Sequence, residues 1–320
     1  MDGIVYLIFG IGILLLLIYD FFFTTLSGSG AGFMSKSISR ISHKVIQGLV
    51  KLFGRGVYSY SGLFVNLKVL SVWIIMVWAG LFLVYSSNPD AIVNSDGIAA
   101  NFWERLYFTG YVLSTLGMGN FYPTSAFFEI LSSFFSFFGF IFFTSSITYF
   151  LSVSSALVKK RLLARTINNL GKSPVDIANT FRRFDKSYTL QQLKALQEMV
   201  DEHAVNHQAY PVIHYYSHPE TDVCLSINLT RLDEALSIML GSDEVVEFRR
   251  EIFPLRQALT NLLTHIYKNF SGEIPSPEAL QNNLSLQYQV TGVEEEVLLY
   301  RRRILDSLLT NEGFSWEAVG

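Results

Sequence analysis

The polar and apolar positions of the chain are unevenly distributed, and three apolar stretches are long enough to cross a lipid bilayer. They run from Gly3 to about Leu26, from about Val69 to Tyr85 and from Ile130 to Val158. A membrane-spanning helix takes about 20 mostly apolar residues. The third stretch is longer than that, so we expect it to tilt or to continue into the cytoplasm. The pattern therefore predicts three transmembrane helices.

The first stretch raises the alternative of a cleaved signal peptide, because small residues follow it at 27–32. However, its start carries Asp2 and no Lys or Arg, and its apolar run is long for a signal core. We therefore expect the first span to be retained.

Beyond residue 158 the pattern changes to charged residues with apolar positions at helical spacing. Ser173 followed by Pro174 is typical of a helix start, and Ser276 followed by Pro277 is a second such start. The segment 214–227 tolerates a strand but predicts no sheet. This half is therefore expected to be a soluble, mainly helical domain. Helical spacing is found at Leu190–Val200, Leu229–Leu240, Val245–Tyr267 and Val293–Leu309.

The basic residues predict the orientation in the membrane, because Lys and Arg collect in cytoplasmic loops. The stretch 86–101 holds Asp90 and Asp96 and no basic residue. We therefore expect a multi-pass protein of the plasma or inner membrane, with its N-terminus outside and its C-terminus in the cytoplasm. The basic residues that flank the spans are Lys36, Arg40, Lys44, Lys51, Arg55 and Lys68, then Lys159, Lys160, Arg161 and Arg165.

The loop between the first two spans has a pattern of its own. Apolar and basic residues alternate from Ile38 to Leu52 as in a basic amphipathic helix. Such a helix can lie on the inner membrane surface or pack on the cytoplasmic part of the protein, and the sequence favours neither. The expected segments are a first span at 1–26, this basic segment at 27–66, a pore module at 67–158 and the cytoplasmic domain at 159–320.

Composition narrows the functional classes. Half of the residues are hydrophobic, only 16% are charged, and the net charge is −3, so nothing indicates nucleic-acid binding. The single cysteine, Cys224, excludes an intrachain disulfide and a multi-cysteine metal site. No glycine-rich nucleotide-binding motif is present in the C-terminal half, and no span carries the groups of an enzyme active site. We therefore expect no enzymatic activity.

The stretch between the second and third spans predicts a pore loop. Residues 103–123 are too few to cross the membrane and return as two full helices, but 102–114 can form about three helical turns. Two glycines then flank Met118. Irregular backbone at membrane depth is tolerated only where it is buried in protein or lines a water-filled path. Closely spaced carbonyl groups, held in line by glycines, can replace the water around a cation.

These residues resemble the pore module of the two-transmembrane potassium channel superfamily. The match rests on Trp-Glu-Arg-Leu-Tyr-Phe at 103–108 and Ser-Thr-Leu-Gly-Met-Gly-Asn-Phe-Tyr-Pro at 114–123, where the family has Thr-Val-Gly-Tyr-Gly-Asp. The resemblance implies an all-α, homotetrameric potassium channel in the lipid bilayer, with a re-entrant pore helix and a filter loop. It implies permeant K+ in the filter, no cofactor and an inner helix at the third span. The implied filter residues are Thr115, Leu116, Gly117, Met118 and Gly119.

Two departures leave the selectivity open. Met118 stands where the family has an aromatic residue, and Asn120 stands at the outer mouth where the family has Asp. A flexible Met fixes the filter width less well, so a weakly selective monovalent cation channel is an alternative. A receptor or adaptor with a vestigial pore loop is another.

Four further residues have expected roles around the pore. Gly139 in the third span is either a gating hinge or a site of close helix packing. Asp20 is expected to reach the membrane interface or to pair with Lys36. Glu104 and Arg105 open the pore helix and are expected to hold it in place rather than to contact ions.

The C-terminal half carries a group of histidines. His203 and His207 lie four residues apart and could share a metal on one helix face. No catalytic motif surrounds them, so the pattern favours a solvated, pH-responsive group with His214 and His218, and no metal site is predicted. An unknown cytoplasmic regulator is an expected partner of this half.

Overall fold

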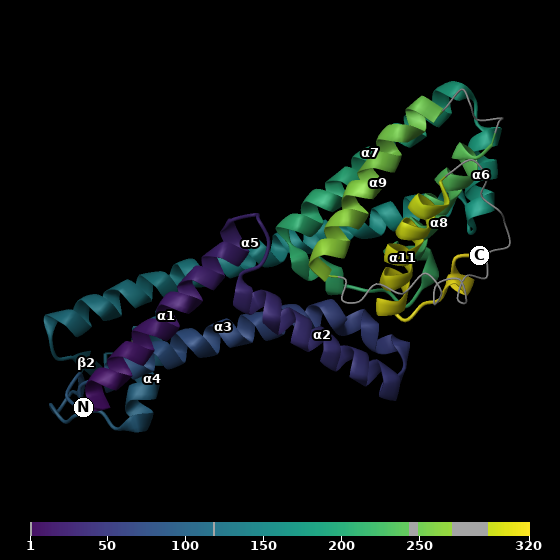
Figure 1. Ribbon diagram of the computed structural model, residues 1–320. Coiled ribbons are helices and arrows are strands. Elements are labelled where there is room, and N and C mark those ends of the chain that lie inside the picture. Colours follow the sequence, from purple (N-terminus) through teal and green to yellow (C-terminus); the bar gives the residue numbers. More distant parts are fainter. Residues whose placement is uncertain (1, 118, 243–248, 271–293) are drawn as a thin grey trace. The chain divides into compact units, whose positions relative to one another are not determined.

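The computed structural model describes residues 2–117, 119–242, 249–270 and 294–320, and these are mainly helical (Figure 1). Met118, the helix start at Ser276 and parts of the segments predicted at 245–267 and 293–309 lie outside them. The helices are α1 (Asp2–Leu26), α2 (Phe33–Phe53), α3 (Ser61–Ser86), α4 (Phe102–Leu113), α5 (Ala126–Leu170), α6 (Pro174–Arg183), α7 (Lys186–Ala209), α8 (Leu225–Leu240), α9 (Arg249–Phe270) and α11 (Glu295–Asn311). The 3₁₀ helices are η1 (Arg55–Tyr60), η2 (Pro211–Tyr215), η3 (Thr221–Val223) and η5 (Trp316–Ala318), and the strands are β1 (Ile92–Asn94) and β2 (Phe121–Pro123).

Three of these helical segments are long and apolar enough to cross a membrane, which confirms the predicted number. They are Asp2–Leu26, Arg55–Ser86 and Ala126–Leu170. The second and third continue beyond the apolar stretches, because no proline interrupts their backbone hydrogen bonds. The chain forms two compact units, of which the first holds residues 1–42 and 64–153 and the second holds 43–63 and 154–320.

The first unit is built on close contact between α1 and α3. A Cβ atom on Gly10 would lie 2.7 Å from the carbonyl oxygen of Gly80, so the absence of side chains lets the two backbones approach. Farther along, the ring of Phe21 packs on Trp73 of α3 and Phe142 of α5, with ring centroids 5.2 and 4.5 Å apart. Aromatic packing thus joins all three helices.

The expectation for Asp20 was wrong. Its side chain is fully buried within the chain rather than exposed at a surface, and no ion pair with Lys36 is found among the described residues. It accepts hydrogen bonds from the backbone N–H of Met34 at 2.9 Å, from the N–H and hydroxyl of Ser35, and from the indole N–H of Trp73 at 3.0 Å. The first N–H groups of a helix have no partner within it, and Asp20 satisfies two of those of α2.

The second unit is mainly helical, as predicted, and α8 is its most buried helix. Ser173 caps α6 by accepting a hydrogen bond from the N–H of Asp176 at 3.1 Å. The segment 214–227 holds parts of η2, η3 and α8 and no strand. It is therefore part of the helical domain.

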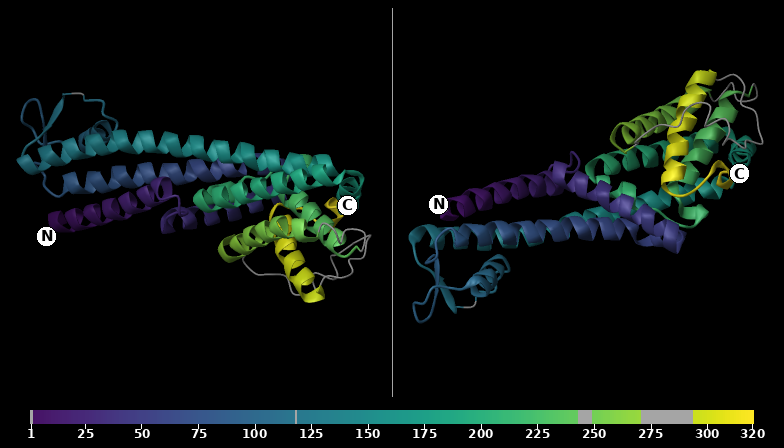
Figure 2. Two further views of the ribbon diagram at one scale, coloured as in Figure 1. Left: turned by 90° about the horizontal axis from the view of Figure 1, so that it is seen from above. Right: turned by 60° about the horizontal axis from the view of Figure 1, so that its bottom comes forward.

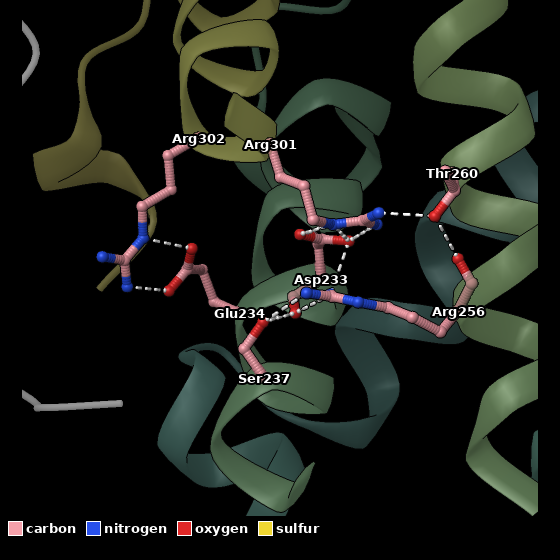
Figure 3. Close-up of polar contacts among 7 residues, drawn as sticks. All are labelled: Asp233, Glu234, Ser237, Arg256, Thr260, Arg301 and Arg302. Carbon is pink, nitrogen blue, oxygen red and sulfur yellow. Dashed lines mark hydrogen bonds and ion pairs between the residues drawn. The ribbon is translucent and has the colours of Figure 1, made fainter. Parts of the chain in front are cut away.

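Buried ion pairs join α8 to α9 and α11 (Figure 3). Asp233 pairs with Arg301 and with Arg256, the latter at 2.9 Å, while Glu234 accepts two hydrogen bonds from Arg302 at 2.7 and 2.6 Å. Burial alone would raise the pKa of Asp233, but the two guanidinium groups outweigh it and lower that pKa. Because a buried charge is costly without its partner, these pairs fix how the three helices pack.

Candidate ion pore

The short helix α4 is held firmly at its beginning. The Asn101 side chain accepts hydrogen bonds from the N–H groups of Trp103 and Glu104, and the Glu104 carboxylate accepts one from the N–H of Asn101 at 2.8 Å. The guanidinium of Arg105 donates to the carbonyl oxygens of Pro89 and Ala100. Glu104 and Arg105 thus have the structural role expected of them.

From this anchor α4 runs back along α3. Phe102 at its start packs on Phe82, with ring centroids 5.1 Å apart. One turn later, the carbonyl oxygen of Leu106 accepts a hydrogen bond from the indole N–H of Trp78 at 3.0 Å. Since Trp78 precedes Phe82 in α3, the two helices are antiparallel, and α4 returns toward the middle of the span.

The end of α4 meets α5 at Gly139, within the first third of that helix. Gly139 lies against the backbone of Leu113, and a Cβ atom on Gly139 would overlap its carbonyl oxygen. Gly139 follows Ala126, the first residue of α5, by 13 residues, a rise of about 20 Å along a helix. Helix α4 therefore turns back into the first unit between its two ends. The contact is one of close packing, and a hinge at Gly139 stays a prediction.

The stretch after α4 takes unusual backbone angles. Thr115 and Gly117 have φ angles of 59° and 66°, in the left-handed region. A residue with a side chain rarely adopts this region, and such strain clusters at functional sites. Leu116, Gly119 and Asn120 are exposed in the single chain, as are Thr115 and Gly117, while Met118 is outside the described residues.

Beyond this stretch the chain is held by strand pairing and by a side-chain hydrogen bond. Strand β2 pairs with β1 in antiparallel register, with Asn94 opposite Phe121. Figure 2 shows this two-stranded sheet and α4 near the ends of α3 and α5. The Tyr111 hydroxyl donates to the carbonyl oxygen of Phe121 at 2.9 Å. Both ends of the glycine-containing stretch are therefore anchored.

Sequence reasoning missed two of these anchors. The capping box of Asn101 and Glu104 follows a known pattern, in which a capping residue precedes Glu by three positions, and could have been found. The bond from Tyr111 to Phe121 had no signal in the sequence, because it depends on the path of the chain between the two residues.

An open groove flanks the same stretch. It has a volume of about 600 Å³ and is bounded by α4, by Thr115 and Gly117, and by the first turns of α5, including Ser133, Ser136 and Phe140.

The histidines of the second unit are placed differently from the expectation. His203 and His207 of α7 are 3% and 2% exposed, so the group is buried rather than solvated. His214 lies beside them and His218 is not among the residues lining their cavity. Among the residues that the structure describes, no group of three or more His, Cys, Asp or Glu side chains is placed to hold a metal ion.

Comparisons with known proteins agree with this geometry. A family model described as an ion channel matches residues 69–155, which include α4 and the stretch after it. The chain is 31% identical over 238 residues to the "uncharacterized membrane protein YdjJ" of Bacillus subtilis (strain 168), a match that covers 73% of this chain and 69% of that protein. No solved structure matches the chain. The chain is therefore a membrane protein of the same family as YdjJ, and its residues 69–155 form the ion-channel module of the two-transmembrane potassium channel family.

Proposed function

We propose that the protein is a potassium-selective channel in which four copies surround one pore. The observation that carries this proposal is the re-entry of α4 between α3 and α5, followed at once by left-handed backbone at Thr115 and Gly117. In the proposed filter, backbone carbonyls of Thr115, Leu116, Gly117, Met118 and Gly119 replace the water around K+, and Asn120 lies at the outer mouth. Conduction is passive and needs no cofactor.

The exposure of the filter stretch supports assembly from several copies. One chain contributes one strand of carbonyls and leaves the groove beside it open. Irregular backbone inside a bilayer needs protein or a water-filled path around it. Four identical strands around an axis provide both, with the groove of each copy covered by its neighbour.

Selectivity depends on how firmly the filter width is held. The usual aromatic residue is missing at Met118, but the hydrogen bond from Tyr111 to Phe121 ties the end of the filter to the pore helix. We infer that this bond supplies part of the missing support and favours K+ over Na+. A weakly selective cation channel is the outcome if it does not.

The second unit is proposed to be cytoplasmic and to control the pore, with the N-terminus of the chain outside the cell membrane. Helix α5 continues without a break from the predicted inner helix to Leu170. A change in the second unit, caused by a cytoplasmic regulator, can therefore be transmitted along one helix. A bend at Gly139 would let that helix open the pore.

Ion flux through purified protein in liposomes tests the proposal. The wild type should pass K+, while Gly117→Ala should abolish the flux without changing the size of the assembly, because Ala cannot adopt the φ of Gly117 cheaply. Gly12→Ala is the matched control, since no atom of the described residues lies within 4 Å of a Cβ placed there. Flux that persists in Gly117→Ala would refute the filter. No flux in the wild type would favour an adaptor with a vestigial pore loop.

A further inference from the structure

The second unit contains a small polar cavity at the end of α5. Its volume is about 30 Å³, room for one or two water molecules. Both Lys160 of α5 and Glu312 after α11 line it, together with imidazoles from three elements. These imidazoles are His43 of α2, His203 and His207 of α7, and His214 of η2.

The hydrogen bonds in the cavity require neutral imidazoles. Nε2 of His207 lies 3.2 Å from Nδ1 of His214, so one nitrogen donates and the other must be unprotonated. The Nδ1 atoms of His203 and His207 are buried and have no hydrogen-bond partner among the described residues. If every ring were protonated, two N–H groups would face each other and further N–H groups would be buried unpaired.

The surrounding charges add to this preference. The Lys160 ammonium lies in the cavity wall and donates to the carbonyl oxygens of Ile213 and Tyr216, at 3.1 and 2.7 Å. The carboxylate of Glu312 faces the cavity but already accepts hydrogen bonds. Its donors are the side chains of Ser217, Cys224 and Ser226. His265 of α9 also packs on His207, with ring centroids 5.4 Å apart.

Burial therefore keeps the imidazoles uncharged. It lowers the pKa of His203 to about 3, with Lys160 adding to the effect. Burial, Lys160 and the neighbouring histidines place the pKa values of His207 and His214 well below their usual value. An opened state, in which these rings reach water, binds protons near pH 6.5. The closed state is thus favoured above that pH and loses its advantage as the pH falls toward the lowered pKa values.

The 3₁₀ helix η2, which brings His214 to the cavity, also contacts the ends of two spans. The last turn of η2 is held to α5 by Lys160, as described above. The hydroxyl of Ser61, the first residue of α3, donates to the carbonyl oxygen of Tyr215 in η2 at 2.6 Å. One short segment that carries His214 therefore holds the beginning of α3 and the extension of α5.

We propose that this histidine cavity is a cytoplasmic proton sensor, in which protonation of His203, His207 and His214 releases η2 from Lys160 and Ser61 and so alters the pore. Its effect on conduction rests on the function proposed above. Each histidine multiplies the equilibrium constant for opening by about ten per pH unit below 6.5. Three together give about a thousandfold at pH 5.5.

Hydrogen exchange of the full-length protein in lipid nanodiscs tests the sensor directly. With intrinsic exchange rates corrected for pH, residues 211–216 should lose protection by about a thousandfold between pH 7.5 and 5.5, while α8 stays protected. His207→Gln combined with His214→Gln should leave a loss of only about tenfold. His218→Gln, outside the cavity, should behave as the wild type. Equal protection at both pH values, or loss in α8 as well, would overturn the sensor.

Two measurements keep the outcomes distinct. If the double variant does not fold, the pH dependence of protection in the wild type decides. A sensor made of several histidines takes up more than one proton when it opens, so its protection must fall more than tenfold per pH unit. Protection that does not change with pH overturns the sensor. Flux in liposomes at pH 7.5 and 5.5 on the cytoplasmic side tests the coupling. Loss of protection without any flux would support the sensor and refute the channel. Flux that ignores pH while protection falls would overturn the coupling.

Discussion

Gly139 of α5 lies directly against the carbonyl oxygen of Leu113, the last residue of α4, with no room for a Cβ atom between them. The contact fixes how deep the proposed pore helix reaches. It also makes the two roles considered for Gly139 experimentally separable. A packing glycine matters for stability, and a hinge matters for opening.

Replacing Gly139 with Ala should destabilise the first unit by about 1–3 kcal/mol, because the methyl group must displace backbone. Thermal unfolding of the purified protein in detergent measures this, and K+ flux should fall with it. Gly12→Ala should leave the flux unchanged and should not lower the melting temperature, because a Cβ atom has room there and Ala favours the helix. An unaltered melting temperature with changed channel opening would instead establish Gly139 as a hinge.

Replacing Asp20 with Asn should loosen the joint between α1 and α2. The amide keeps the shape but weakens the acceptor for the N–H groups of Met34 and Ser35 and the indole of Trp73, at a cost of about 1.5–3 kcal/mol. Hydrogen exchange should then accelerate at residues 34–38. Asp96→Asn, at an exposed position, is the control. Unchanged protection at 34–38 would mean that the buried carboxylate does not hold α2.

Replacing Tyr111 with Phe removes the hydroxyl that donates to the carbonyl oxygen of Phe121. A hydrogen bond of this kind contributes about 1 kcal/mol, so the K+ to Na+ permeability ratio should fall by about fivefold. Tyr107→Phe is the matched control, since it keeps the ring that packs 6.2 Å from Phe121. Equal ratios in both variants would show that the filter width is held elsewhere.

The spans and the position of the pore loop could be predicted because they depend on local sequence. The length of an apolar stretch such as Ile130–Val158 can be read directly from the sequence. The glycines at 117 and 119 lie between two such stretches. Basic residues alone predicted the orientation, which stays a prediction.

Features that depend on distant partners could not be predicted. Asp20 is followed by basic residues, and nothing local shows that the N-terminus of α2 folds back onto it. His203 and His207 stand among charged residues and were expected in solvent, yet α9 and η2 bury them. In each case a long-range contact outweighs the composition nearby.

The most direct test of the central claim is the reversal potential of the purified channel with K+ on one side of the membrane and Na+ on the other. A carbonyl filter at Thr115–Gly119 predicts current through the wild type, with a reversal potential displaced toward the K+ equilibrium by about 59 mV for each tenfold preference. Current with a reversal potential at zero would support a cation pore but contradict its selectivity for potassium. The absence of any current would contradict the channel itself.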